Sequence, residues 1–176
     1  GVATFGGRCI QSVSGTGSGT NNVVFGSSDT GDALTDGSHN AFFGSNNCGG
    51  AVTTGSYNVG IGGSSLEQLT TGSSNTAVGY NTGQNNQGGS FNMSFGNQAG
   101  NLSGQGNCAF GYKVLRGGST GAYNIGMGYE TGFAISTGHY NIAIGAWALT
   151  IATNTSHSLA IGIGALRNFN TSGDGE

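Results

Sequence analysis

The chain has no proline and very little charge, and each shortage excludes a class of protein. Collagen is excluded because proline is missing and the 38 glycines do not recur at every third position. Four Lys and Arg residues are too few for the basic stripe that nucleic acid or an anionic membrane surface requires. No apolar run approaches the roughly 20 residues of a membrane span. We therefore expect neither nucleic-acid binding nor membrane insertion. No signal peptide is evident at Gly1, so we expect a processed chain or export without one.

The low charge also bears on whether the chain is disordered, monomeric or part of an assembly. Disordered chains combine high net charge with few apolar residues, but here the net charge is −3 and the apolar residues recur in step. A soluble monomer usually carries a charged surface. We therefore expect a regular repeat that hides much of its surface in an assembly, or stays dissolved through Ser, Thr, Asn and Gly alone.

A five-residue phrase, Asn–apolar–small–apolar–Gly, recurs along the chain at spacings of 18, 18, 17, 17, 15, 17, 17 and 17 residues. Ser158 replaces Asn in the last copy, and VATFG at 2–6 resembles a degenerate earlier copy. The phrase begins at Asn22, Asn40, Asn58, Asn75, Asn92, Asn107, Asn124 and Asn141, and it closes at Gly26, Gly44, Gly62, Gly79, Gly96, Gly111, Gly128, Gly145 and Gly162.

A period near 17 residues is too short for helical-hairpin repeats and fits one coil of a β-solenoid. Inside the phrase, large apolar residues alternate with small ones, as in Val59–Gly60–Ile61, which is the period of a strand. Val24 and Phe42 depart from the small pattern. We expect the large residues to supply the core. The small residues would form an open face through which three chains pack around a common axis.

Two further segments complete each coil. The segment after the closing glycine, such as SSLEQL at 64–69, is expected to be a second strand or a bend. Turn phrases such as TGSYN then return, with a glycine three residues before the Asn. Glycine there suits backbone angles that are closed to other residues. Asn at the same place in every coil predicts a hydrogen-bonded ladder.

The copies NTAVGYNTG (75–83), NIAIGAWAL (141–149) and LAIGIGAL (159–166), alternating with TTG-type turns, resemble the repeats of bacteriophage tail fibres. In that family such repeats often precede a C-terminal chaperone domain that is cleaved after trimerisation; none follows residue 176 here. The phrase is also similar to head repeats of trimeric autotransporter adhesins, which are left-handed β-rolls of three chains with a somewhat shorter period. The resemblance covers about 19–168 and informs architecture more than ligand.

The slot before the Asn holds a row of rings that we expect along one edge of the rod, stacked between neighbouring coils. The alternative is a shallow strip for a host-surface glycan, with rings against sugar faces and Asn and Ser supplying hydrogen bonds; a protein receptor stays open. Trp147 is expected to pack. The candidate receptor- or carbohydrate-binding residues are His39, Tyr57, Phe91, Tyr123, Tyr140 and His157.

The three cysteines show no CxxC pattern, which argues against zinc. Cys48 and Cys108 take apolar positions of the repeat, so we expect core residues. They lie about 19 Å apart by coil spacing, too far for a disulfide. Cys9 precedes the regular repeats and is expected to be free or to link chains.

Other polar residues give no catalytic pattern. His39, His139 and His157 are expected at turn surfaces, with a metal site in a trimer as the alternative. The acidic group Asp29, Asp32 and Asp36 lacks a calcium-loop pattern. Glu67 and Glu130 lie about four coils apart, too far for a glycosidase pair. No Ser–His–Asp spacing is present, so we expect no enzyme activity, cofactor or metal.

The sequence thus predicts an all-β parallel solenoid of about nine coils of about 17 residues, in a homotrimeric fibre. Residues 1–18 would be an N-terminal segment or degenerate first coil, 19–168 the repeat domain, and 169–176 a tail leading to a missing downstream region. The expected role is an extracellular phage tail-fibre shaft or head that presents a receptor-binding surface for host attachment. The alternatives are a bacterial trimeric surface adhesin, or a monomeric ice- or carbohydrate-binding solenoid.

Overall fold

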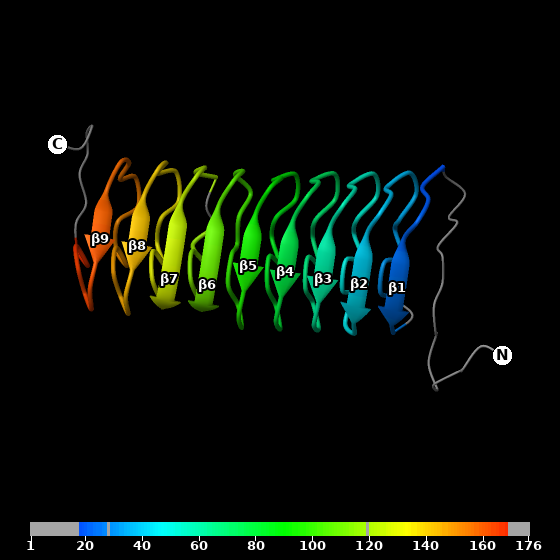
Figure 1. Ribbon diagram of the computed structural model, residues 1–176, viewed down its shortest axis with the longest axis horizontal. Coiled ribbons are helices and arrows are strands. Elements are labelled where there is room, and N and C mark those ends of the chain that lie inside the picture. The colour runs from blue at the N-terminus through cyan, green and yellow to red at the C-terminus, as the bar shows by residue number, and fades with distance from the viewer. Residues whose placement is uncertain (1–17, 28, 119, 169–176) are drawn as a thin grey trace.

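The computed structural model describes residues 18–27, 29–118 and 120–168 and forms a rod of stacked coils, with β1 and β9 at opposite ends (Figure 1). VATFG at 2–6, Cys9 and the tail 169–176 lie outside the described residues. Each coil contributes one strand to a nine-stranded sheet in sequence order, paired parallel throughout. The strands are β1 (Val23–Gly26), β2 (Ala41–Gly44), β3 (Val59–Ile61), β4 (Thr76–Val78), β5 (Met93–Phe95), β6 (Cys108–Tyr112), β7 (Ile125–Tyr129), β8 (Ile142–Ile144) and β9 (Leu159–Ile161).

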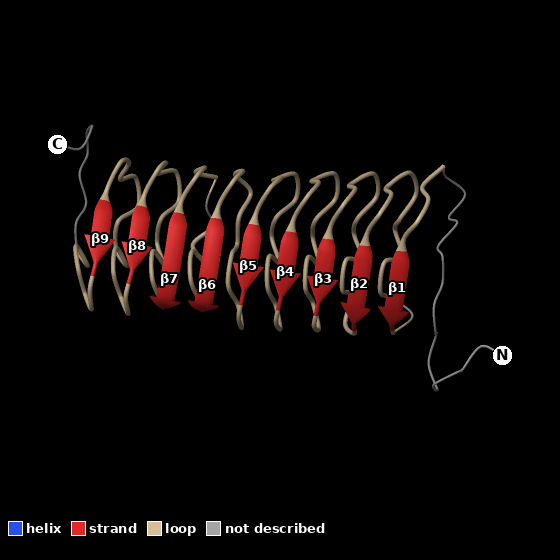
Figure 2. Ribbon diagram, in the orientation of Figure 1, coloured by secondary structure: helices blue, strands red, loops and turns tan. Residues whose placement is uncertain are grey.

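The register of the sheet confirms the period read from the sequence. Val59 pairs with Thr76 and Ile61 with Val78, so equivalent residues of the phrase lie side by side. The rest of each coil is loop and turn, and no helix occurs among the described residues (Figure 2). The predicted β-solenoid is therefore confirmed, with one strand per coil. The segment after the closing glycine is a bend, the second of the two alternatives expected for it. A helix long and apolar enough to cross a membrane is likewise not found in the described part.

The closing glycines are required by both conformation and space. Gly62 has φ +117°, and a Cβ added there would lie 2.5 Å from the carbonyl oxygen of Gly79 in the next coil. The glycine of the turn phrase has the same close neighbour: a Cβ on Gly55 would lie 2.3 Å from the carbonyl oxygen of Gly72. A side chain at either position would push neighbouring coils apart. This accounts for two glycines in nearly every repeat.

The buried asparagines form the predicted ladder. The side-chain Oδ1 of Asn124 accepts hydrogen bonds from the backbone N–H of Asn141 at 3.0 Å and from its Nδ2 at 2.9 Å. The Nδ2 of Asn124 donates to the carbonyl of Gly138 at 2.8 Å. The same pattern runs from Asn22 to Ser158, whose backbone N–H closes it. The ladder satisfies buried backbone groups at the corner where each turn enters its strand.

The expected orientation of the strands is wrong. The small residues of the phrase point into the solenoid, and Ala77, Ala109, Ala143 and Ala160 are buried. The large apolar residues on either side of them point outward. The Gly and Ala face is therefore the inner wall of each coil, and three chains cannot pack through it.

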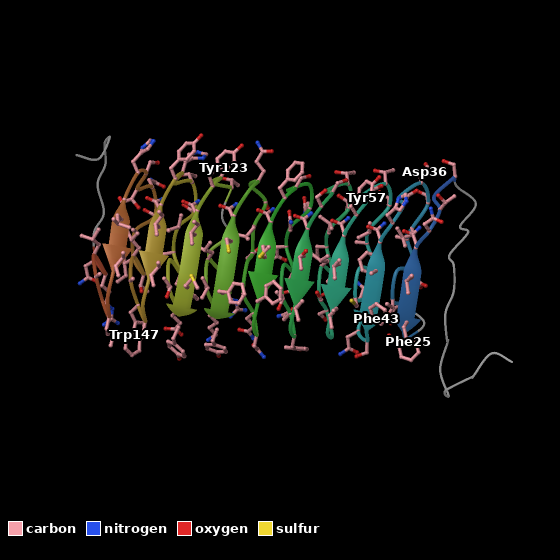
Figure 3. All side chains as sticks on the ribbon, viewed as in Figure 1. Phe25, Asp36, Phe43, Tyr57, Tyr123 and Trp147 are labelled. Atoms are coloured by element: carbon pink, nitrogen blue, oxygen red, sulfur yellow. The ribbon has the colours of Figure 1, made fainter. Side chains whose placement is uncertain are left out.

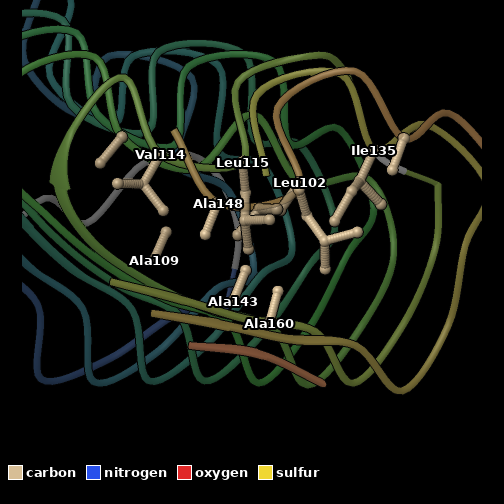
Figure 4. Packing of buried hydrophobic residues seen from close by; sticks show 11 residues of the cluster. Leu102, Ala109, Val114, Leu115, Ile135, Ala143, Ala148 and Ala160 are labelled. Carbon is tan, nitrogen blue, oxygen red and sulfur yellow. The ribbon is translucent and has the colours of Figure 1, made fainter. Parts of the chain in front are cut away.

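The core is filled from the bends instead, which explains the small residues opposite. Leu66, Leu115 and Leu149 are fully buried, although each has a positive φ near 50°. The close view in Figure 4 shows bend residues such as Leu115 facing strand residues such as Ala143. One narrow coil has room for large side chains from one wall only.

In the coil of Phe42 the large core side chain comes from the strand and the smaller ones come from the bend. The Phe42 ring points inward and is fully buried. Opposite it, Cys48 stands where other coils have leucine, and a Cβ on Gly49 would lie 2.7 Å from the ring. The smaller bend residues leave the volume that the phenylalanine occupies. The prediction that Cys48 is a core residue is confirmed.

Candidate functional site

The largest unexplained feature is the outer surface of the sheet, which we term the strand face. It consists of the first and third residues after the ladder position in each coil. Many of its side chains are about 40% exposed, and Ile161 at the end of the sheet is 65% exposed. The members are Val23, Phe25, Ala41, Phe43, Val59, Ile61, Thr76, Val78, Met93, Phe95, Cys108, Phe110, Ile125, Met127, Ile142, Ile144, Leu159 and Ile161.

The strand face contains no charged residue, and Thr76 is its one hydroxyl. Phe95 and Phe110 stack on it with ring centroids 4.8 Å apart. Cys108 lies on this face and is half-buried, so the prediction that it belongs to the core is wrong. Desolvation raises the pKa of its thiol. Neither Cys48 nor Cys108 forms a disulfide.

The second surface, the aromatic edge, follows the turn corners beside the strand face and comprises His39, Tyr57, Phe91, Tyr123, Tyr140 and His157. These residues are exposed, and all have φ near +60°. Each of these residues directly precedes a ladder asparagine or Ser158. Its left-handed backbone conformation turns its own side chain away from the core. Figure 3 shows Tyr57 and Tyr123 along the same edge of the rod.

Neighbouring rings of the aromatic edge stack, as the sequence predicted. The ring centroids of His39 and Tyr57 lie 4.9 Å apart, those of Tyr123 and Tyr140 5.2 Å, and those of Tyr140 and His157 5.3 Å. The spacing is close to that of parallel strands, about 4.8 Å. The solenoid therefore places its rings in a row with the repeat of its own backbone.

The row has two gaps, which the sequence analysis missed. Ser74 and Gly106 occupy the ring position in their coils, one on each side of Phe91. Phe91 is 67% exposed, more than any of the three tyrosines of the edge. The gaps can be read from the sequence, because Ser74 and Gly106 stand directly before their ladder asparagines, where neighbouring coils have aromatic residues.

A recess of about 380 Å³ opens beside the Gly106 gap. It coincides with the coil that is 15 residues long, and the shorter turn leaves space between its neighbours. Its lining comes from four successive turns: Gly88, Gly89, Ser90, Ser103, Gly104, Gln105, Thr120, Ala122 and His139. Most of its polar atoms are hydroxyl, amide and backbone groups, so the recess is suited to a neutral polar ligand.

A smaller cavity, of about 50 Å³, lies between Gln98, Asn101 and Arg116. The buried Oδ1 of Asn101 has no hydrogen-bond partner in the structure. A space of this size holds water, which would satisfy that oxygen. The neighbouring guanidinium makes it a poor site for a cation.

A second aromatic group lies at the other end of the strands. Tyr112 and Tyr129 stack at 5.2 Å, Tyr129 meets Trp147 edge to face at 5.6 Å, and Arg167 lies over the indole ring. Trp147 also donates from Nε1 to Glu130 at 3.3 Å. The indole contacts these neighbours but is 36% exposed, so Trp147 is a surface residue and the expectation of a packed side chain holds only in part.

The predicted polar candidates are dispersed. The carboxylate of Asp36 accepts hydrogen bonds from the backbone and hydroxyl of Ser18. The Ser27 hydroxyl and nearby backbone N–H groups lower the pKa of Asp29. Glu67 accepts from the amide of Gln84, far from Glu130 along the rod. Within the described ranges, no three His, Cys, Asp or Glu side chains gather into a possible metal site. The exposed histidines lie on turns, where His39 and His157 belong to the aromatic edge.

Comparisons of the chain with protein-family models, with curated proteins and with solved structures found no match.

Proposed function

We propose that the chain is the repeat segment of a homotrimeric extracellular fibre, in a bacteriophage tail fibre or a related fibrous adhesin, whose task is mechanical. It provides a stiff support that holds or presents a receptor-binding surface for attachment to a host cell. The observation that carries the proposal is the strand face, a continuous apolar strip on a chain with almost no charge.

The size of the strand face supports self-association. Eight strand spacings of about 4.8 Å give a strip roughly 38 Å long. With side chains in two columns its width is roughly 12 Å, for an apolar area of roughly 450 Å² per chain. This reaches the size at which exposed apolar patches on monomers become functional. Three such strips meeting at one axis bury roughly 1,350 Å² in all, or roughly 450 Å² for each pair of chains. One pair alone is below the size of a stable two-chain interface, so the association requires all three chains together.

The form of the strand face favours copies of the same chain as the partner. A straight ladder with a regular spacing matches another ladder of equal length, and the absence of charge removes repulsion between identical surfaces. The packing differs from the sequence-based expectation, because the large apolar residues rather than the Gly and Ala residues meet at the axis.

A trimeric bacterial surface adhesin has the same physical requirements and remains the second candidate; neighbouring virion genes or a membrane-anchor domain would separate the two. An ice-binding solenoid requires a flat, regular ladder of threonines on one strand. The strand face carries one threonine, Thr76, which disfavours that function.

The test is the mass in solution, measured by light scattering with and without reductant. We expect three times the 17.4 kDa of the chain in both conditions, because packing and not a disulfide holds the copies together. A monomer in both conditions would overturn the proposal. A trimer that dissociates on reduction would assign the association to a cysteine instead of the strand face.

A further inference from the structure

We propose that a neutral pyranose with all-equatorial substituents binds between Phe91 and Tyr123, over Gly106, with its hydroxyl groups in the adjoining recess. The inference deepens the proposed function by naming the ligand class of a surface site. It depends on the turns of one chain and not on the trimer.

Phe91 and Tyr123 provide two walls. They occupy the same position in coils two steps apart, so the backbone places the two residues roughly 10 Å apart. A pyranose needs about half of that on each side to lie against an aromatic face. Its axial C–H groups carry slight positive charge and meet the negative face of each ring. A single missing ring in a stacked row therefore leaves a slot of pyranose thickness.

Gly106 has no side chain to hold the neighbouring ring back. A Cβ added there would lie 2.7 Å from Cδ1 of Tyr123, so the tyrosine ring lies over the glycine and narrows the slot. The ring is 47% exposed and stacks on Tyr140 behind it. An entering sugar would move the Tyr123 ring away from Gly106 and take the place of the absent side chain, between the faces of Phe91 and Tyr123.

The recess supplies the polar contacts. Ser90, Gln105 and Ala122 directly precede Phe91, Gly106 and Tyr123, so the recess adjoins the slot. His139 accepts the backbone N–H of Ala122 at Nδ1, so the neutral ring carries its hydrogen on Nε2. None of the described residues that line the recess carries a carboxylate, ammonium or guanidinium group, which favours a neutral polyhydroxylated ligand over a charged one.

Two aromatic walls also select ring configuration. In a β-glucopyranoside every hydroxyl is equatorial, so both faces present only C–H groups. A galactopyranoside has an axial hydroxyl at C4 and a mannopyranoside one at C2. That hydroxyl would be pressed against an aromatic ring without a hydrogen-bond partner, which weakens binding.

The experiment titrates the full chain with methyl β-D-glucopyranoside, methyl β-D-galactopyranoside and methyl β-D-mannopyranoside, observed by NMR. We expect the glucoside to bind with a Kd on the order of 1–10 mM. The other two glycosides are expected to bind about tenfold more weakly. The solution mass is recorded on the same samples, so that a failure to trimerise and a failure to bind are separate results.

Two variants locate the site and two serve as controls. Gly106→Tyr completes the row and fills the slot, and it should fold because Tyr123 and Tyr140 adopt the same left-handed conformation. Its glucoside binding should fall at least tenfold. Phe91→Ala removes one exposed wall and should weaken binding about fivefold or more. Ser74→Tyr fills the other gap, and His157→Ala removes a distant ring; both should bind as the wild type does.

The proposal is overturned if the glucoside shows no binding at 50 mM to wild-type chain, a concentration about five times the weakest expected Kd. It is equally overturned if Gly106→Tyr, with an unchanged thermal transition, binds as well as wild type. Equal binding of all three glycosides would exclude a slot with two walls. Loss of binding in Ser74→Tyr alone would place the site in the other gap and contradict the assignment.

Discussion

At the scale of single residues, two glycines that are neighbours in sequence have opposite requirements. Gly62 has a backbone conformation that is strained for other residues, and it touches the next coil. Gly63 has no positive φ, and a Cβ there would meet its nearest atom, Cδ2 of Tyr80, at an ordinary 3.4 Å. The repetition of glycine therefore reflects only some positions of the coil.

We predict that Gly62→Ala lowers the free energy of unfolding by about 3 kcal/mol, through backbone strain and the contact with Gly79. Gly63→Ala should change it by less than about 0.5 kcal/mol. Denaturant unfolding of both variants measures the difference. Equal effects of the two substitutions would contradict the role assigned to the closing glycine.

A second prediction at this scale concerns Cys48 and the pH dependence of stability. Desolvation raises the pKa of its buried thiol from the ordinary 9.0 to about 12. Below pH 9 the thiol is protonated in both states and contributes no pH dependence. Between pH 9 and 12 the unfolded chain loses the proton first, so stability falls with rising pH, by up to about 1.4 kcal/mol per unit.

The measurement compares unfolding of wild type and Cys48→Ala at pH 8 and pH 10. The variant has its own cavity cost, so the informative quantity is the change between the two pH values. We expect wild type to lose about 1.4 kcal/mol more than the variant. The same loss in both proteins would show that the thiol of Cys48 is not protected by the fold.

At the scale of the element, the asparagine ladder joins each strand to the next through side chains as well as backbone. Asn124 → Ala would leave the buried N–H of Asn141 and the carbonyl of Gly138 without the partners they have now. We predict a loss of about 3 kcal/mol of unfolding free energy. The exposed Asn97, changed to Ala, should cost less than about 0.5 kcal/mol. Thermal or denaturant unfolding checks both; a small effect at Asn124 would mean that water replaces its contacts.

The strands, the period and this ladder could be predicted from the sequence, because they depend on which residues recur. The orientation of the strands could not. Alternation of Ile142, Ala143 and Ile144 shows that the two faces differ, but it does not show which face is inside. That choice depends on volume supplied by bend residues such as Leu115 and Leu149, which repeat less regularly. The aromatic row was predicted for the same reason as the ladder, whereas the recess arises from one shortened coil and needs coordinates to be seen.

At the scale of the whole molecule, the strand face is expected to determine the assembly. Ile142→Glu places a charge on that face, where burial in a trimer would desolvate it. Ile151→Glu makes the same change at a bend residue that is 51% exposed and lies off the face. We predict that the first variant is monomeric and that the second keeps the wild-type mass by light scattering. Identical masses for both variants would place the interface elsewhere.

The strand face also affects how the chains of the proposed bundle align along its axis. A ladder of identical rungs could meet its copies equally well after sliding by one coil. Here the outward residue at the third position changes in size along the rod, in the order Phe25, Phe43, Ile61, Val78, Phe95, Phe110, Met127, Ile144 and Ile161. In the proposed bundle, a one-coil slip would set Ile61 against Phe43 and Val78 against Phe95, and open gaps along the axis. The irregularities of the repeat thus select one longitudinal registry for three otherwise periodic chains.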